Sequence, residues 1–142
     1  MSCIRVEIPL TIIEGGTLNK TFQWKTGDPL LPVDLTGFTA HMQIRAKLKE
    51  EVVLLDVPSS IEVWAADEDT GIYFYDGVTI PDDEGKWRIY LRDNDTMGLC
   101  VLHKNIIGVY DNFLYSAAGE AVLQQFGVAT ILASVTRAEP EP

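Results

Sequence analysis

Hydrophobic and polar residues alternate with a period of two along most of this chain, and Gly, Pro, Asp and Asn punctuate the pattern. A strand with one buried face has this period, because successive side chains point to opposite sides of a sheet. The clearest cases are 38–46 and 86–92, whose predicted buried positions are Ala40, Met42, Ile44, Trp87, Ile89 and Leu91. The pattern therefore predicts an all-β protein.

Turn signals separate the predicted strands in the first third of the chain. Residues 5–13 are expected to form an opening strand and 20–25 its hairpin partner, joined by a glycine-containing turn at 14–17. Prolines within 26–37 cannot donate to a β-ladder, so this segment is expected to link two sheets.

Three later segments have little or no polar face. Residues 106–115 and 128–135 are largely apolar on both sides, as expected for central strands or for strands that a neighbouring subunit covers. Residues 72–75, Ile-Tyr-Phe-Tyr, have no polar position, which predicts a strand that is central or buried in an assembly.

The predicted architecture is an antiparallel two-sheet β-sandwich, Ig-like, with an open β-barrel as the runner-up. A single helical turn is predicted at 93–98, with Asp93 or Asp95 as its cap. The 142 residues, 46% hydrophobic and 23% charged, suit one globular domain. We expect that domain to cover 1–138, with 139–142 as a short loose tail.

The excess of acidic over basic residues argues against nucleic acid as a partner. Lys and Arg number 11 against 21 for Asp and Glu, a net charge of -10, whereas proteins that follow a phosphate backbone are normally basic. The apolar stretches fall short of the roughly 20 residues that cross a bilayer, and the first residues lack signal-peptide features. We therefore expect no nucleic-acid or membrane partner, cytoplasmic synthesis, and reduced thiols at Cys3 and Cys100.

Motifs for catalysis and cofactor binding are lacking. The sequence has no G-x-S-x-G, H-E-x-x-H or C-x-x-C motif. Residues 15–21 superficially resemble a phosphate-binding loop, but no Gly directly precedes Lys20 and no helical pattern follows, so we interpret them as a hairpin turn. Of the four cysteines and histidines, Cys100 and His103 form a local pair, whereas structural zinc sites usually have two. The chain is predicted to be non-enzymatic, without metal or cofactor.

Three acidic clusters, at 67–69, 82–84 and 93–95, leave calcium binding open as an alternative. Each lies in a predicted turn, where carboxylates more often bind the local backbone in water. The first cluster fails the EF-hand spacing, because Gly71 comes one position early and no helices flank it.

The aromatic residues are the strongest candidates for a functional surface. We interpret them as core and subunit-interface residues, because aromatic side chains pack readily on a pleated surface. A carbohydrate-binding module is the alternative from another class, and it would require exposed, coplanar Trp64, Tyr73 and Tyr75. The predicted interface residues are Trp64, Tyr73, Phe74, Tyr75, Tyr110, Phe113 and Tyr115.

Several short motifs give the chain a family resemblance. It resembles a group of small β-rich structural proteins of tailed bacteriophages and prophages. The motifs are WKTG at 24–27, PVDLTGFTAHMQIR at 32–45, GKWRIYL at 85–91, VYD at 109–111, SAAGE at 116–120, GVA at 127–129 and VTR at 135–137. Residues 59–84 have no counterpart, and Asn112 stands where an apolar residue is common in the group.

The resemblance implies a virion component that packs against other copies of itself and other virion proteins. A position on the tail, the baseplate or the tail-fibre attachment is expected first, and capsid decoration is the alternative. The protein would be a homo-oligomer in the virion, made in the cytoplasm of the bacterial host.

Overall fold

The computed structural model describes residues 4–46, 49–60, 64, 69–77, 79–80, 83–100 and 104–133. Cys3, His103, the 139–142 tail and half of the first two acidic clusters, namely 67, 68 and 82, lie outside these residues. The elements are β1 Ile4–Glu7, β2 Leu10–Ile13, β3 Leu18–Gln23, β4 Lys25–Thr26, β5 Leu31–Pro32, β6 Thr39–Ala46, β7 Lys49–Pro58, β8 Gly71–Asp76, β9 Asp83–Leu91, α1 Asp93–Thr96, β10 Ile106–Tyr115 and β11 Ala121–Leu132.

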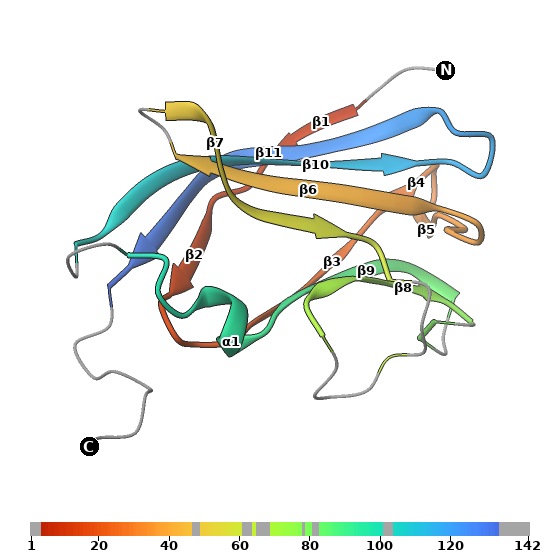
Figure 1. Ribbon diagram of the computed structural model, residues 1–142. Coiled ribbons are helices and arrows are strands. Elements are labelled where there is room, and N and C mark those ends of the chain that lie inside the picture. The colour runs from red at the N-terminus through yellow and green to blue at the C-terminus, as the bar shows by residue number, and fades with distance from the viewer. Residues whose placement is uncertain are drawn as a thin grey trace.

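Two sheets face each other across the main core, so the all-β prediction is confirmed (Figure 1). The large sheet has six strands in the order β1-β11-β10-β6-β7, and β2 also pairs with β11. The small sheet has the order β3-β9-β8, and β4 pairs with β5 in a short ribbon. A backbone bridge from Ser59 to Ile72 joins the end of β7 to β8, and the described strands do not close into a barrel.

Two predictions about strand pairing were wrong. The large sheet is mixed, because β1 and β2 both run parallel to β11. The expected hairpin between 5–13 and 20–25 does not form, because β3 pairs with β9 in the other sheet and places Phe22 opposite Trp87. In this arrangement the apolar side chains of β2 and β3 meet the core from opposite sheets. In a hairpin they would share one face of one sheet.

The glycine-containing turn after β2 is tied to the helical turn α1. The backbone N–H of Gly15 donates to Thr96 Oγ1 at 3.1 Å, and that hydroxyl donates to the Gly16 carbonyl at 2.7 Å. Strand β3 begins at Leu18, so a strand and not a helix follows the turn, as expected. The turn does not close the predicted hairpin, because β2 and β3 lie in different sheets. A bound phosphate would need backbone N–H donors in this turn, and the Gly15 N–H already donates to the Thr96 hydroxyl.

Helix α1 confirms the predicted helical turn, but its cap differs from the prediction. Arg92 holds the N-cap position, and no side chain caps the helix there. The Arg92 backbone N–H donates to Thr70 Oγ1 at 2.8 Å, which ties the N-cap residue to the segment before β8 without capping the first helical turn.

The main core confirms the two clearest alternating patterns. Met42 and Ile44 of β6, and Ile89 and Leu91 of β9, have no exposed surface, and Trp87 is 3% exposed. Phe74, Leu114 and Ile131 also belong to this cluster, which brings together residues from both sheets.

A second cluster covers the opposite face of the small sheet. It contains Tyr73, Ile80 and Tyr90, with Trp64 and Tyr75 packed against them. The Trp64 ring meets Tyr73 and Tyr90 edge-on, at centroid distances of 4.8 and 5.1 Å. Strand β8 is therefore apolar on both faces because it contributes to two clusters, although it lies at the edge of its sheet.

The Asp34-Leu35-Thr36-Gly37 motif forms a tight turn before β6. Asp34 Oδ1 accepts from the backbone N–H of Thr36 at 3.0 Å and from its hydroxyl at 2.7 Å. These bonds, the hydroxyl first, lower the pKa of the Asp34 carboxyl. Gly37 has a φ of +83°, which favours glycine, and Leu35 is fully buried.

Candidate functional site

The outward face of the large sheet carries both aromatic and charged side chains. Alternation along β10 turns Tyr110, Asn112 and Leu114 inward, and the residues between them outward. We define the outer face by Arg5, His41, Gln43, Arg45, Val109, Asp111, Phe113, Tyr115, Gln124, Phe126 and Val128.

Aromatic side chains lie along the middle strands of this outer face. Phe113 and Tyr115, both half-buried, stack with a centroid distance of 6.1 Å and an interplanar angle of 24°. On β11, Phe126 lies beneath the guanidinium of Arg5 at 4.5 Å, in cation–π geometry. These rings present flat apolar surface that a partner could cover.

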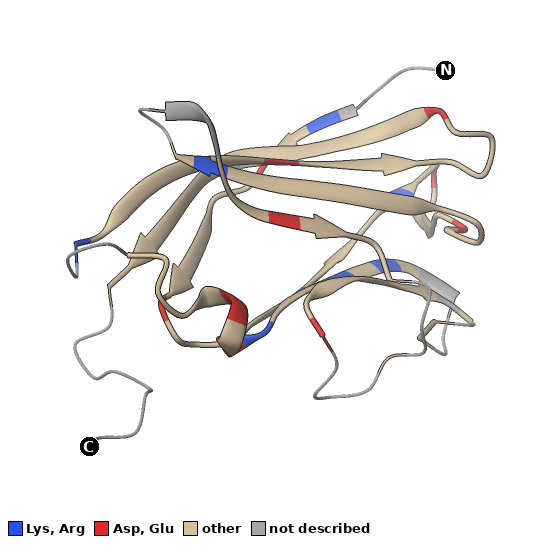
Figure 2. Ribbon diagram, in the orientation of Figure 1, with Lys and Arg blue, Asp and Glu red and all other residues tan. Residues whose placement is uncertain are grey.

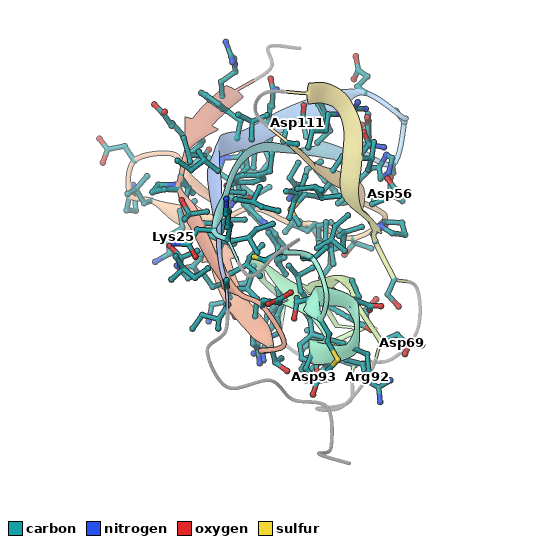
Figure 3. The ribbon with its side chains drawn as sticks, turned by 60° about the vertical axis from the view of Figure 1, so that its left-hand side comes forward. Lys25, Asp56, Asp69, Arg92, Asp93 and Asp111 are labelled. Carbon is teal, nitrogen blue, oxygen red and sulfur yellow. The ribbon has the colours of Figure 1, made fainter. Side chains whose placement is uncertain are left out.

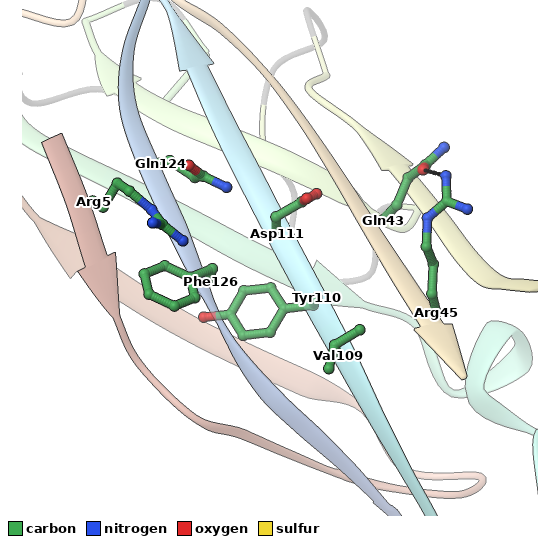
Figure 4. A pocket seen from close by; sticks show the side chains of 8 residues that line it. All are labelled: Arg5, Gln43, Arg45, Val109, Tyr110, Asp111, Gln124 and Phe126. Carbon is green, nitrogen blue, oxygen red and sulfur yellow. Dashed lines mark hydrogen bonds between the residues drawn. The ribbon is translucent and has the colours of Figure 1, made fainter. Parts of the chain in front are cut away.

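An open depression of about 200 Å³ lies beside Phe126, as Figure 4 shows. Asp111 projects from β10 between Arg5 on one side and Gln43 and Arg45 on the other. Arg45 Nη2 donates to Gln43 Oε1 at 2.5 Å, which fixes the direction of both side chains. The centre of the outer face therefore carries charges of both signs.

The rim of the outer face toward β7 is polar. Asp56 Oδ1 lies 2.5 Å from His41 Nε2 and accepts from Gln43 Nε2 at 2.9 Å. The Gln43 bond, followed by the His41 bond, lowers the pKa of the Asp56 carboxyl. Asp56 and Asp111 lie on the large sheet, whereas Asp69, Arg92 and Asp93 gather at the α1 end (Figures 2 and 3).

The structure divides the seven predicted interface residues into three groups. Phe113 and Tyr115 lie on the outer face, and Trp64 and Tyr75 are half-buried in the second cluster. Tyr73, Phe74 and Tyr110 are only 2–3% exposed within the chain itself. For these three, the apolar pattern reflects packing inside the chain.

Arg88 holds the half-buried rings of the second cluster in place. Its guanidinium lies 4.9 Å from the Trp64 ring and 5.6 Å from the Tyr75 ring. It also donates to the Tyr75 hydroxyl, and the Tyr73 hydroxyl donates to the Asp69 carbonyl at 2.7 Å. Trp64 and Tyr73 are inclined by 73°, so these rings do not form the coplanar platform that a sugar would stack on.

Tyr110 turns inward and reaches the segment between β1 and β2. Its ring lies opposite Gly127, and its hydroxyl donates to the Ile8 carbonyl at 2.7 Å. A Cβ on Gly127 would lie 2.6 Å from the same carbonyl oxygen, so glycine is required for this approach. Burial raises the pKa of Tyr110 to about 12, and the nearby Gln125 amide offsets a small part of that rise.

We expect Tyr110→Phe to lower the free energy of unfolding by about 1–2 kcal/mol at pH 8, because the buried Ile8 carbonyl loses its donor. The raised pKa means that the folded state favours the neutral phenol, so this stabilisation is complete below about pH 10 and is lost as the pH rises toward 12. Urea unfolding of both proteins from about pH 8 to pH 11 tests this. The deficit of the variant should shrink with rising pH, and a constant deficit would contradict the assignment.

Among the described residues, no group of three or more His, Cys, Asp or Glu side chains could hold a metal ion. Asp93 and Asp95 of the third acidic cluster lie in the first turn of α1, where Asp95 accepts a hydrogen bond from the Thr70 hydroxyl. Cys100 is a buried thiol that donates to the Ile131 carbonyl at 3.6 Å.

Sequence reasoning missed Arg5, Asp111, Gln124 and Phe126 as parts of the outer face. The polar side of the 38–46 strand was visible in the alternation, and it supplies the edge formed by His41, Gln43 and Arg45. The parallel pairing of β1 with β11 brings Arg5 onto Phe126, and no local pattern indicates that pairing.

No known protein-family model matches the chain, and no curated protein matches it in sequence. Within the residues that the structure describes, no helix is both long enough and apolar enough to cross a bilayer.

Proposed function

We propose that this chain is a non-enzymatic structural component of a tailed bacteriophage virion and that it acts through protein–protein interfaces. The observation that carries the proposal is the outer face of the large sheet. Phe113, Tyr115 and Phe126 supply flat apolar area there, and Arg5, Asp111 and Arg45 place charges of both signs among and beside these rings. Protein–protein interfaces are enriched in aromatic residues and arginine.

The family resemblance supports the same proposal. Its longest motif, residues 32–45, forms the Asp34 turn and β6, and 85–91 forms most of β9. These residues specify the fold, so the resemblance points to a shared scaffold whose work is done by exposed faces. The partners would be other copies of the chain and other virion proteins.

We favour a position at the tail, the baseplate or the tail-fibre attachment, and capsid decoration is the alternative. Either position would use the outer face in a symmetric assembly. The net charge of -10 would keep a many-copy protein soluble in the host cytoplasm before assembly, and it disfavours nucleic acid as a partner. The second alternative, a carbohydrate-binding module, has less support, because Tyr73 is buried and Trp64 meets it edge-on.

Imaging of particles by electron cryo-microscopy, with and without this gene product, tests the proposal. Loss of density at the tail or its tip would support a tail component, and loss of regularly spaced knobs on the shell would support the decoration alternative. Unchanged density, with the protein absent from purified particles, would overturn the virion proposal.

A variant of the outer face tests the surface itself. Phe113→Glu places a charge beside Tyr115 on a half-buried site, and we expect at least a tenfold loss of incorporation into particles with the fold retained. Ala118→Glu, on the exposed turn that follows β10, adds the same charge at a residue outside the defined outer face and should incorporate normally. Equal incorporation of both variants would remove the outer face from the proposal.

A further inference from the structure

The apolar part of the outer face extends beyond its aromatic rings. Alternation along β10 turns Ile107 to the outward side, and Val53 of β7 lies on the same side because it pairs with Arg45. Ile107, Val53 and Val128 are 56%, 41% and 39% exposed. A contiguous exposed apolar patch on a sheet marks an interaction site.

The outer face is almost neutral, although the chain is strongly acidic. Arg5 and Arg45 are set against the carboxylates of Asp56, Asp111 and Glu7, and Glu7 lies on the same side of β1 as Arg5. The whole chain has a net charge of -10, so nearly all of its excess acidic charge lies elsewhere. Two copies of the chain therefore repel each other least when their outer faces meet, whereas a basic partner would be drawn to the rest of the surface.

Two opposite charges on this face lack a partner in the described part of the chain. The Arg5 guanidinium lies 4.5 Å from the centroid of the Phe126 ring, and Asp111 is paired with Phe126 across β10 and β11, so the two charges flank one ring (Figure 4). Neither side chain makes an ion pair or a side-chain hydrogen bond with another described residue. A guanidinium and a carboxylate can bind each other through two parallel hydrogen bonds, so each of these groups is one half of a strong contact.

We propose that the outer face is covered by the outer face of a second copy of this chain, with Arg5 of each copy bound to Asp111 of the other. A twofold axis that lies in the interface, midway between Arg5 and Asp111 and perpendicular to the line that joins them, exchanges their positions. Both ion pairs then form at once. Phe126 lies between the two charges, so it meets Phe126 of the partner subunit near the axis, and the two rings shield the ion pairs from water.

This inference rests on the proposed function for the role of the outer face as an assembly surface, and it deepens that function by naming what covers the face. The self-complementary charges are the reason for choosing a second copy over a different protein. Self-association of the full chain in solution tests the inference without any particle.

Sedimentation equilibrium of the full chain should show a reversible dimer. Arg5→Asp and Asp111→Arg each set like charges against one another, so each should weaken dimerisation at least tenfold. Arg5→Asp makes the chain more acidic and Asp111→Arg makes it less acidic, so a general effect of net charge would move the two variants in opposite directions. Lys20→Asp is the matched control, because it makes the same change as Arg5→Asp at an exposed residue of β3 in the small sheet, and it should dimerise like the natural chain.

An equimolar mixture of the Arg5→Asp and Asp111→Arg chains identifies the contact. In the mixed dimer each contact again joins a guanidinium to a carboxylate, so the mixture should associate nearly as tightly as the natural chain. A contact inside one chain cannot produce this rescue. A natural chain that is monomeric at all concentrations, single variants that dimerise normally, or a mixture without rescue would each overturn the inference.

Methyl signals in NMR spectra of the natural chain locate the contact without any substitution. The signals of Ile107 and Val128 should shift with protein concentration. The signals of Leu30, which is 64% exposed at the turn between β4 and β5, should stay constant. Shifts at Leu30 with none at Val128 would assign self-association to another surface and overturn the inference.

The two proposals fail separately. A chain that dimerises through the outer face but is absent from particles would retain this inference and lose the virion function. A chain that stays monomeric in solution, and whose incorporation into particles still fails in Phe113→Glu, would retain the function and assign the outer face to a different virion protein.

Discussion

Replacing Trp87 with alanine is expected to lower the free energy of unfolding by about 3–5 kcal/mol. Trp87 is 3% exposed, and its ring stacks on Phe22 at a centroid distance of 5.9 Å. Its Nε1 donates to Gln125 Oε1 at 3.2 Å, so the change also removes one of the two donors to a fully buried amide. The free energy of unfolding falls for two reasons: the change leaves a large cavity between the sheets, and it weakens a buried polar network.

Urea unfolding followed by far-ultraviolet circular dichroism measures this loss without relying on tryptophan fluorescence. Trp87→Phe is the control that keeps an aromatic ring and removes the N–H, and it should cost clearly less than alanine. A loss below about 1 kcal/mol for Trp87→Ala would mean that this ring does not support the core.

Gly85→Ala is expected to lower the free energy of unfolding by about 2–5 kcal/mol, because two penalties add. Gly85 has a φ of +68°, a conformation that costs a residue with a side chain about 1–2 kcal/mol. An added Cβ would also lie 2.7 Å from the Trp24 carbonyl oxygen and 2.8 Å from the Val33 nitrogen, and overpacking of this kind typically costs about 1–3 kcal/mol. The Trp24 N–H donates to the Gly85 carbonyl at 2.8 Å, so the two segments cannot separate without losing that bond.

Gly119→Ala separates the two penalties. Gly119 has a φ of +89°, but an added Cβ would meet nothing within 4 Å. It should therefore show the conformational cost alone, about 1–2 kcal/mol. If Gly85→Ala and Gly119→Ala prove equally destabilising in urea unfolding, the close approach of β9 to Trp24 and Val33 contributes nothing to stability.

The local elements were predictable where one face of a strand is polar. The 38–46 pattern predicts β6 and its buried residues, because a strand with one buried face has an apolar residue at every second position. The turn at Asp34 was predictable for a similar reason, since the aspartate and the glycine each have a local role within four residues.

Patterns without a polar face were ambiguous. Residues 72–75 lack one because Ile72 and Phe74 enter the main core while Tyr73 enters the second cluster. A strand between two clusters of its own chain and a strand covered by a neighbouring subunit have the same sequence pattern. The burial of Tyr73 and Phe74 therefore could not be distinguished from an interface before the fold was known.

The sequence by itself determined the all-β class, the positions of most strands and turns, and which residues of β6 and β9 enter the main core. These properties depend on each residue and its neighbours within a few positions. The tertiary structure alone decided the parallel pairing of β1 and β2 with β11, the pairing of β3 with β9, and which side chains meet on the outer face. The physical reason is that these pairings join residues up to about 120 positions apart, such as Ile4 and Leu123, and their free energy comes from burying both sheets together.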